Sequence, residues 1–230
     1  MSALINRRTI LQSAGLAGMA AAGPRTAFGA DAVGTTVVDL PFDPAKIPGL
    51  SEKLLVSHHD NNYAGAARKL DGISARLASF EITTVPGFAI NGLKREQLMA
   101  ANSVFLHELY FAGLSGQNVM VGDVAKILMR DFGSVEAWRN EFVAMGKAQG
   151  GGSGWVLLTY SLRAKRLINQ WAGDHTNTLA DGLPVLALDM YEHAYQMDYG
   201  AKAADYIDAY MKVINWANVA ALHEKYTALS

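Results

Sequence analysis

The stretch that decides the fold is "PVLALDMYEHAYQMDYG", Pro184–Gly200. Four apolar residues, Val185–Leu188, come directly before Asp189, and Glu192 and His193 follow within four residues. A short apolar run of this kind predicts a buried strand. A buried carboxylate costs several kcal/mol unless it is paired or bound to a metal. The stretch therefore predicts a strand that ends at a buried metal ligand, with Asp189 and His193 four residues apart and able to share a face.

The composition limits the function classes. The chain has 230 residues, of which 50% are hydrophobic and 18% are charged, so it can form one domain, or two small ones, with a sizeable core. The formal net charge of -1 gives no reason to expect nucleic acid or an anionic membrane as a partner. The absence of cysteine excludes disulfides, thiolate nucleophiles and thiolate-bound metals. A metal would be held by His, Asp, Glu or backbone oxygen, which favours iron, manganese or zinc.

Residues 1–30 have the organisation of an export signal. The Arg7–Arg8 pair is followed by a mildly apolar stretch and then by small residues. The pair and Thr9–Leu11 resemble a twin-arginine signal, whose export machinery carries folded proteins. The apolar part is too short to span a bilayer permanently. We expect an exported, periplasmic or secreted protein, cleaved near Ala30 or Ala32, with no membrane segment in its mature form.

The next part of the chain predicts an arm and a helical hairpin. Residues 31–48 lack periodicity and contain three prolines, so they predict an extended arm. Residues 49–120 predict a helical hairpin domain, whose first helix begins after the N-cap residue Ser51 and is bent or weakened at Gly65 and Gly72.

Between the two helices of this hairpin we expect a loop that carries Pro86, Gly87 and Gly92. The second helix is expected from Lys94 and should stop at Gly113, because glycine commonly follows the last residue of a helix.

Residues 121–230 predict an α+β domain. Two amphipathic helices come first, three strands follow at 155–162, 165–173 and 184–191, and helices close the chain. The first two strands are close enough in sequence to form a hairpin. The expected fold is α+β: an N-terminal helical hairpin, then a mixed domain with a small three-stranded antiparallel sheet and helices.

Three histidines can join Asp189 at one metal ion. His58 lies in the first predicted helix and His107 in the second, and the antiparallel helices of a hairpin can bring such residues face to face. With His193 and Asp189 they would form a set of three nitrogen ligands and one oxygen ligand. Such a set suits iron or manganese.

Two other helix histidines are not expected at this ion. His59 points about 100° away from His58 around a helix. His223 lies in the terminal helix, and we expect it at the surface.

Several stretches, in order, resemble the iron/manganese superoxide dismutase family. The family's helix before the sheet is similar to "DFGSVEAWRNEF", and its Gly-Ser-Gly-Trp strand entry is similar to "GGGSGWVLL". Its Asp-x-Trp-Glu-His-Ala-Tyr motif is similar to "LDMYEHAYQMDYG", and its closing Asn-Trp helix is similar to "VINWANV". The resemblance extends over residues 39–226. It implies disproportionation of superoxide to dioxygen and hydrogen peroxide at one iron or manganese ion per subunit. It also implies one bound solvent molecule and the ligands His58, His107, Asp189 and His193.

The resemblance implies further roles around the ion. The family forms homodimers or tetramers, in which Glu192 would reach a ligand histidine of the other subunit. His175, fourteen residues before Asp189, stands where some members have a histidine that hydrogen-bonds the metal-bound solvent. Trp155 and Tyr191 would form the dry wall beside the metal, with Tyr191 in place of the usual Trp.

The first predicted helix departs from the family's His-x-x-x-His-His-x-x-Tyr pattern. Without a gap, Asn62 and Tyr63 take the places of the two later histidines, and Ala66 that of the Tyr that guards the substrate channel. With a three-residue gap, Tyr63 would be this guard. We favour the ungapped alignment, because deleting three residues from a helix turns everything after it by about 300°. Gln196 stands where a second Tyr is usual, and in the family that Tyr contacts the histidine of the first helix in the partner subunit. The resemblance therefore implies an amide contact between subunits, made by Asn62 and Gln196, which cannot relay a proton.

Two functions are compatible with these residues. The first is a superoxide dismutase that depends on iron or manganese. The alternative is an exported, non-catalytic metal-binding or structural dimer of the same fold, which the missing Tyr and His would explain.

Overall fold

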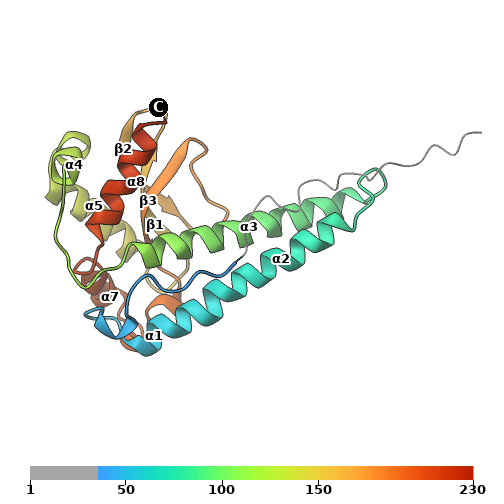
Figure 1. Cartoon of the computed structure of the whole chain (residues 1–230), viewed down its shortest axis with the longest axis horizontal. Coiled ribbons are helices and arrows are strands. Elements are labelled where there is room, and N and C mark those ends of the chain that lie inside the picture. The colour runs from blue at the N-terminus through green and yellow to red at the C-terminus, as the bar shows by residue number, and fades with distance from the viewer. Residues whose placement is uncertain (1–35, 230) are drawn as a thin grey trace, which may run out of the picture.

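The structure is a computed structural model that describes residues 36–229; the predicted export signal and the start of the arm lie outside the described residues. A long helical hairpin extends from a body of sheet and shorter helices (Figure 1). The α+β fold predicted from the sequence is confirmed. Within residues 36–229, no helix combines the length and the hydropathy that a bilayer crossing requires.

The arm leads into the first helix. It contains one 3-10 turn, Pro44–Lys46, and it buries Ile47 in the core. Helix α1 (Glu52–Ser57) starts where predicted, because the side chain of Ser51 accepts a hydrogen bond from the Leu54 N–H and so caps the helix.

A π-helical segment, His58–Tyr63, joins α1 to α2 (Ala64–Ala78). Gly65 and Gly72, which we expected to bend or weaken this helix, both lie within α2 and do not interrupt it, and the irregular turn precedes them. A π turn has hydrogen bonds from residue i to i+5 and holds an additional residue. The regular helix that we assumed in favouring the ungapped alignment is therefore absent between His58 and Tyr63.

Helix α3 (Gly87–Ala112) packs along α2 and completes the hairpin (Figure 1). It ends before Gly113, as predicted. It begins seven residues earlier than the predicted Lys94, and the loop expected at Gly92 is wrong because this glycine lies inside the helix. Packing of α3 against α2 outweighs the roughly 1 kcal/mol by which glycine disfavours a helix.

The sheet has the three strands predicted from the sequence. They are β1 (Trp155–Ser161), β2 (Arg166–Ala172) and β3 (Gly182–Asp189), in the order β2-β1-β3, with both neighbouring pairs antiparallel. Trp155, the first residue of β1, pairs with Asp189, the last residue of β3. This register brings the glycine-rich entry of the sheet beside the carboxylate that ends it.

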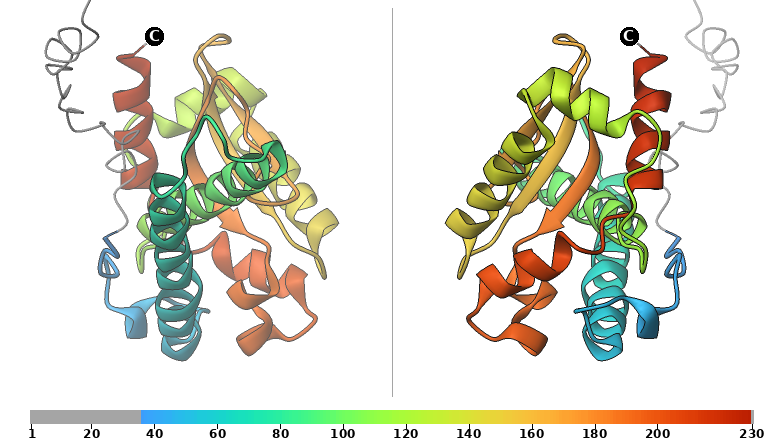
Figure 2. Two further views of the ribbon diagram at one scale, coloured as in Figure 1. Left: turned by 90° about the vertical axis from the view of Figure 1, so that its right-hand side faces the viewer. Right: turned by 90° about the vertical axis from the view of Figure 1, so that its left-hand side faces the viewer.

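Helices surround the sheet, as Figure 2 shows. Helix α5 (Val135–Gln149) contacts β1 and β2, α4 (Val124–Phe132) contacts β2, and α3 and α8 (Trp216–Thr227) contact β3. After β3 come a 3-10 turn, Glu192–Ala194, and helices α6 (Gln196–Tyr199) and α7 (Ala203–Tyr210).

The expectation that His223 lies at the surface is wrong. Its exposure is 8%, and its ring lies edge-on to that of Tyr160 at a centroid distance of 5.6 Å. The terminal helix α8 packs on the body of the protein, and His223 is on the face that it buries.

Asp131 joins α4 to β2. Its carboxylate accepts two hydrogen bonds from Arg130, at 2.6 and 2.8 Å, and one from the Leu167 backbone N–H at 2.8 Å. Burial alone would raise the pKa of Asp131, but the bonds from Arg130 and Leu167 hold it below its usual value of 3.8. The stability that this carboxylate provides is therefore complete above its pKa in the unfolded chain and is lost as the pH falls through the lower folded pKa.

We expect Asp131→Asn to lower the free energy of unfolding by about 2 kcal/mol at neutral pH, because the amide cannot accept all three bonds. The difference in the free energy of unfolding between the variant and the unmodified protein should become smaller when the pH is below the usual Asp pKa. Urea denaturation at neutral and acidic pH measures both effects. Asp123→Asn is the control, since its ion pair with Lys126 is exposed and solvent screening should leave its contribution to stability small. Equal effects of the two substitutions would contradict this role of Asp131.

Candidate metal centre

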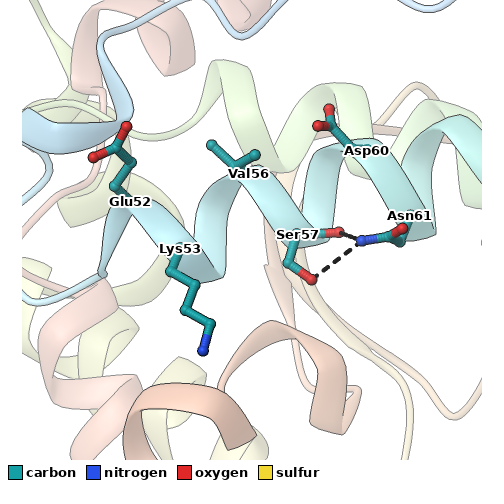
Figure 3. A pocket seen from close by; sticks show the side chains of 6 residues that line it. All are labelled: Glu52, Lys53, Val56, Ser57, Asp60 and Asn61. Atoms are coloured by element: carbon teal, nitrogen blue, oxygen red, sulfur yellow. Dashed lines mark hydrogen bonds between the residues drawn. The ribbon is translucent and has the colours of Figure 1, made fainter.

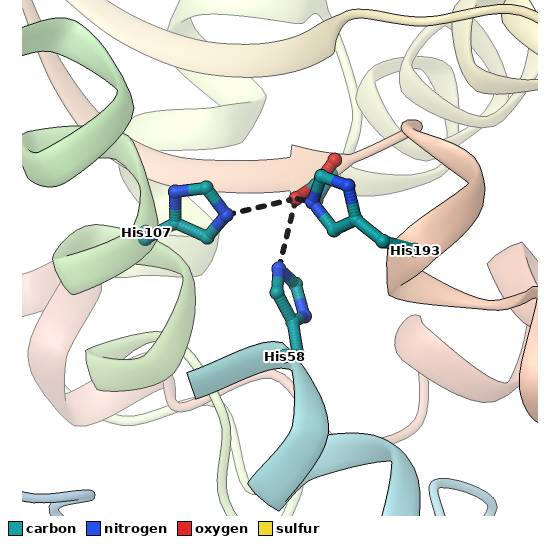
Figure 4. A group of neighbouring side chains, drawn as sticks. His58, His107 and His193 are labelled. Carbon is teal, nitrogen blue, oxygen red and sulfur yellow. Dashed lines mark hydrogen bonds and ion pairs between the residues drawn. The ribbon is translucent and has the colours of Figure 1, made fainter. Parts of the chain in front are cut away.

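The four side chains predicted as metal ligands come together in the structure. From Asp189 Oδ2, the Nε2 atoms of His58, His193 and His107 lie 3.1, 3.2 and 3.7 Å away. One ligand atom from each of the four residues lies within 4.8 Å of all the others. Figure 4 shows the three imidazole rings converging from three separate elements.

Four separate elements of the fold each supply one residue of this group. His58 opens the π turn, His107 lies in α3, Asp189 ends β3, and His193 lies in the 3-10 turn that follows. His58 and His107 are each 1% exposed and Asp189 is 0% exposed. A buried group of this kind requires a partner for its charge.

The protonation and hydrogen bonding of His107 show whether a metal fits between these residues. Its Nδ1 lies 2.6 Å from the backbone oxygen of Ser103 and therefore carries a proton. Burial, and then the neighbouring His58, lowers the pKa of His107 to about 3, so the ring is neutral and Nε2 has a lone pair. This atom has no hydrogen-bond partner within residues 36–229. A lone pair that faces a carboxylate oxygen is repelled unless a cation lies between them, so the residues fit a bound metal ion.

The carboxylate of Asp189 is ionised and fixed in orientation. Burial alone would raise its pKa, but His193 and His58 hold the pKa well below its usual range. The second oxygen, Oδ1, accepts a hydrogen bond from the Tyr191 N–H at 2.8 Å. Tyr206 Oη donates to the backbone oxygen of Asp189 at 2.9 Å.

His175 lies beside this group and is held by two aromatic residues. Trp155 Nε1–H donates to His175 Nδ1 at 3.0 Å. Because an indole N–H can only donate, Nδ1 carries the lone pair and a neutral His175 has its proton on Nε2. Tyr191 stacks on the rings of both His175 and His193, at centroid distances of 4.7 and 5.4 Å. His175 thus provides an N–H donor next to the ligands.

Three residues predicted at a subunit contact share one shallow hollow. Asn62, Glu192 and Gln196 line it together with Ser57, His193 and Met197. Glu192 and Gln196 are exposed in the single chain. Tyr63, which we expected either in the place of a later histidine or as the channel guard, does not line this hollow; it is 1% exposed, and its hydroxyl is bonded to Glu108 and Val38.

Another hollow lies on the outward face of α1 (Figure 3). It is lined by Glu52, Lys53, Val56, Ser57, Asp60 and Asn61. The Asn61 amide donates to the backbone oxygen and to the hydroxyl of Ser57, at 3.0 and 3.3 Å. These bonds stay within one helix, and none of the four predicted ligands lines the hollow, so we assign no site to it.

Sequence reasoning missed two residues of α3. Asn102 Nδ2 donates to the backbone oxygen of His175 at 2.5 Å, and Glu108 accepts from Tyr63 Oη at 2.9 Å. Both are polar residues close to His107 in a largely apolar part of the helix, which is the signal that could have identified them.

Comparison with known proteins agrees with this geometry. The sequence profile of iron/manganese superoxide dismutases, C-terminal domain, matches residues 120–222. An iron superoxide dismutase of Cupriavidus metallidurans is 60% identical over 178 residues, which are 77% of this chain and 90% of that protein. The manganese superoxide dismutase 2 of Haloferax volcanii is 32% identical over 190 residues, covering 81% and 94%. An iron superoxide dismutase of Aquifex pyrophilus is 32% identical over 190 residues, covering 79% and 88%. The chain belongs to the iron/manganese superoxide dismutase family.

Proposed function

We propose that this protein is a superoxide dismutase that converts superoxide to dioxygen and hydrogen peroxide with one iron or manganese ion per subunit. The observation that carries the proposal is the convergence of three imidazole Nε2 atoms on one buried carboxylate oxygen. The unprotonated, unpartnered Nε2 of His107 requires a cation there. The names of the similar proteins, which include iron and manganese enzymes, support this reading.

A bound iron or manganese ion would supply one-electron oxidation and reduction in turn. The protein's own residues bind this ion and limit the access of water. Trp155 is 0% exposed and pairs in the sheet with Asp189, while Tyr191 covers the His193 ring. The Nε2–H of His175 is a donor that can orient a small anion such as superoxide, or a solvent molecule, by a hydrogen bond.

The test combines metal analysis with a superoxide assay. We expect iron or manganese in a ratio near one per chain, loss of turnover after chelation, and recovery on reloading. His175→Ala should retain the metal and lose turnover by about tenfold to a hundredfold, whereas His175→Gln keeps an N–H donor and should lose less. Full metal occupancy without turnover would instead support the non-catalytic alternative.

We also propose that residues 1–30 direct export by the twin-arginine route, since Arg7–Arg8 and the apolar stretch after them resemble such a signal. A reporter protein fused after Ala32 should reach the periplasm. Replacing both arginines by lysine should stop this export, and unchanged export would contradict the proposal.

We further propose a homodimer in which Glu192 accepts a hydrogen bond from His193 of the other subunit. The support is that Glu192, Gln196 and Asn62 line an open hollow next to His193. Sedimentation should give a dimer, and Glu192→Ala should speed metal release from it. A monomer that is fully active would contradict the proposal.

A further inference from the structure

Tyr63 joins three segments of the chain through one hydroxyl group. Its Oη donates to Glu108 Oε1 at 2.9 Å and accepts from the Val38 backbone N–H at 3.0 Å. The backbone oxygen of Val38 lies 2.8 Å from His59 Nε2. We call this set of bonds, among Tyr63, Glu108, Val38 and His59, the Tyr63 junction. It connects the N-terminal arm, the π turn and α3.

The junction is attached directly beside two of the proposed ligands. His59 follows His58, and Glu108 follows His107. The ring of Tyr63 lies 6.4 Å from that of His107, centroid to centroid. A change in the junction therefore acts on the backbone positions next to both ligands.

The π turn explains how Tyr63 reaches α3. In a regular α-helix a residue five positions further on points about 140° away from the first. In the π turn the hydrogen bonds run from i to i+5, so Tyr63 is brought round toward the side of His58. π turns frequently occur at functional sites, and here the turn allows one helix to present both a ligand and a bond to α3.

We propose that Tyr63, Glu108 and the backbone of Val38 are positioning residues that hold the His58 helix and α3 at the separation required by the metal ion. This rests on the proposed metal centre, but not on superoxide turnover. The Tyr63 side chain is buried, so the folded state would be destabilised if the partners of its hydroxyl moved away and left it without hydrogen bonds. The junction thus fixes the distance between two ligands before the ion binds, and ligands held in place bind more tightly.

The experiment measures the rate of metal release from the full-length, metal-loaded protein into excess chelator. Tyr63→Phe should release metal about tenfold faster, and the spectrum of the bound metal should change. Glu108→Gln keeps an acceptor for the Tyr63 hydroxyl and should stay close to the unmodified rate. Val38→Pro removes the N–H that donates to Tyr63 and keeps the backbone oxygen near His59, at a position that is 52% exposed. It should speed release in the same direction.

Tyr210→Phe is the matched control. Tyr210 is also fully buried, and its Oη donates to the backbone oxygen of Ala187 at 2.7 Å, but it is not bonded to a residue adjacent to a ligand. The Tyr210→Phe variant should be less stable than the unmodified protein but should not release metal faster. If Tyr63→Phe does not fold, Val38→Pro and Glu108→Gln give the same comparison.

Unchanged metal release in Tyr63→Phe or Val38→Pro would overturn this role, and so would equal acceleration in Tyr210→Phe. A metal-bound protein without superoxide turnover would overturn the proposed function alone. A protein that binds no metal would overturn both.

Discussion

Asp189→Asn is expected to abolish metal binding, and with it superoxide turnover, without lowering the stability of the metal-free protein. Asp189 is the only anion in the four-residue group, and the amide has nearly the same shape but no charge. In the metal-free protein the substitution removes hydrogen bonds from His58 and His193. It also removes a fully buried charge, and the two effects oppose each other.

Two measurements check this expectation. Metal analysis should find the Asn variant empty after loading under conditions that fill the unmodified protein. Added metal should raise the thermal midpoint of the unmodified protein and leave that of the variant unchanged. At a metal concentration a hundredfold above the dissociation constant, the free energy of unfolding of the unmodified protein should rise by about 2.7 kcal/mol. Asp208→Asn, at an exposed position of α7, is the control. A variant that retains metal would contradict the assignment of Asp189.

Gly154→Ala should lower stability more than any of the other substitutions proposed for this protein. The backbone φ of Gly154 is +130°, and an added Cβ would lie 2.3 Å from the Ala172 oxygen and 2.8 Å from Gln149 Oε1. The strained backbone and the overlap should together lower the free energy of unfolding by at least about 3 kcal/mol. Because the next residue is Trp155, the hydrogen bond to His175 should be displaced and superoxide turnover should fall.

Urea denaturation and a superoxide assay on the same preparation measure both effects. Gly72→Ala is the comparison, since Gly72 lies in α2 and an added Cβ would meet nothing within 4 Å. That substitution should raise stability by up to about 1 kcal/mol. If Gly154→Ala had the same free energy of unfolding as the unmodified protein, the backbone at the start of β1 could shift without a loss of stability, and this prediction would be wrong.

The sheet and the ligand group could be predicted because their signals are local. The apolar run before Asp189 and the aromatic and apolar residues of β1 mark strands by composition alone. His58 and His107 were placed in two helices of one hairpin, and the pairing of such helices brings residues of this kind together.

The features that sequence reasoning missed depend on contacts between distant segments. The π turn is accompanied by the bonds of Tyr63 to Glu108 and Val38, and no local pattern predicts them. The early start of α3 depends on its packing against α2, which overrides the weak preference of glycine. The burial of His223 follows from the docking of α8, which helical periodicity alone did not reveal.

The metal centre has a consequence for a chain without cysteine. His58 and Asp189 are 131 positions apart, so an ion bound to both acts as a covalent-like cross-link between the two ends of the fold. Closing a loop of this length restricts the unfolded chain more than closing a short one does. Release of the ion would therefore weaken the attachment of the helical hairpin to the sheet, and the cooperativity of unfolding should depend on metal occupancy.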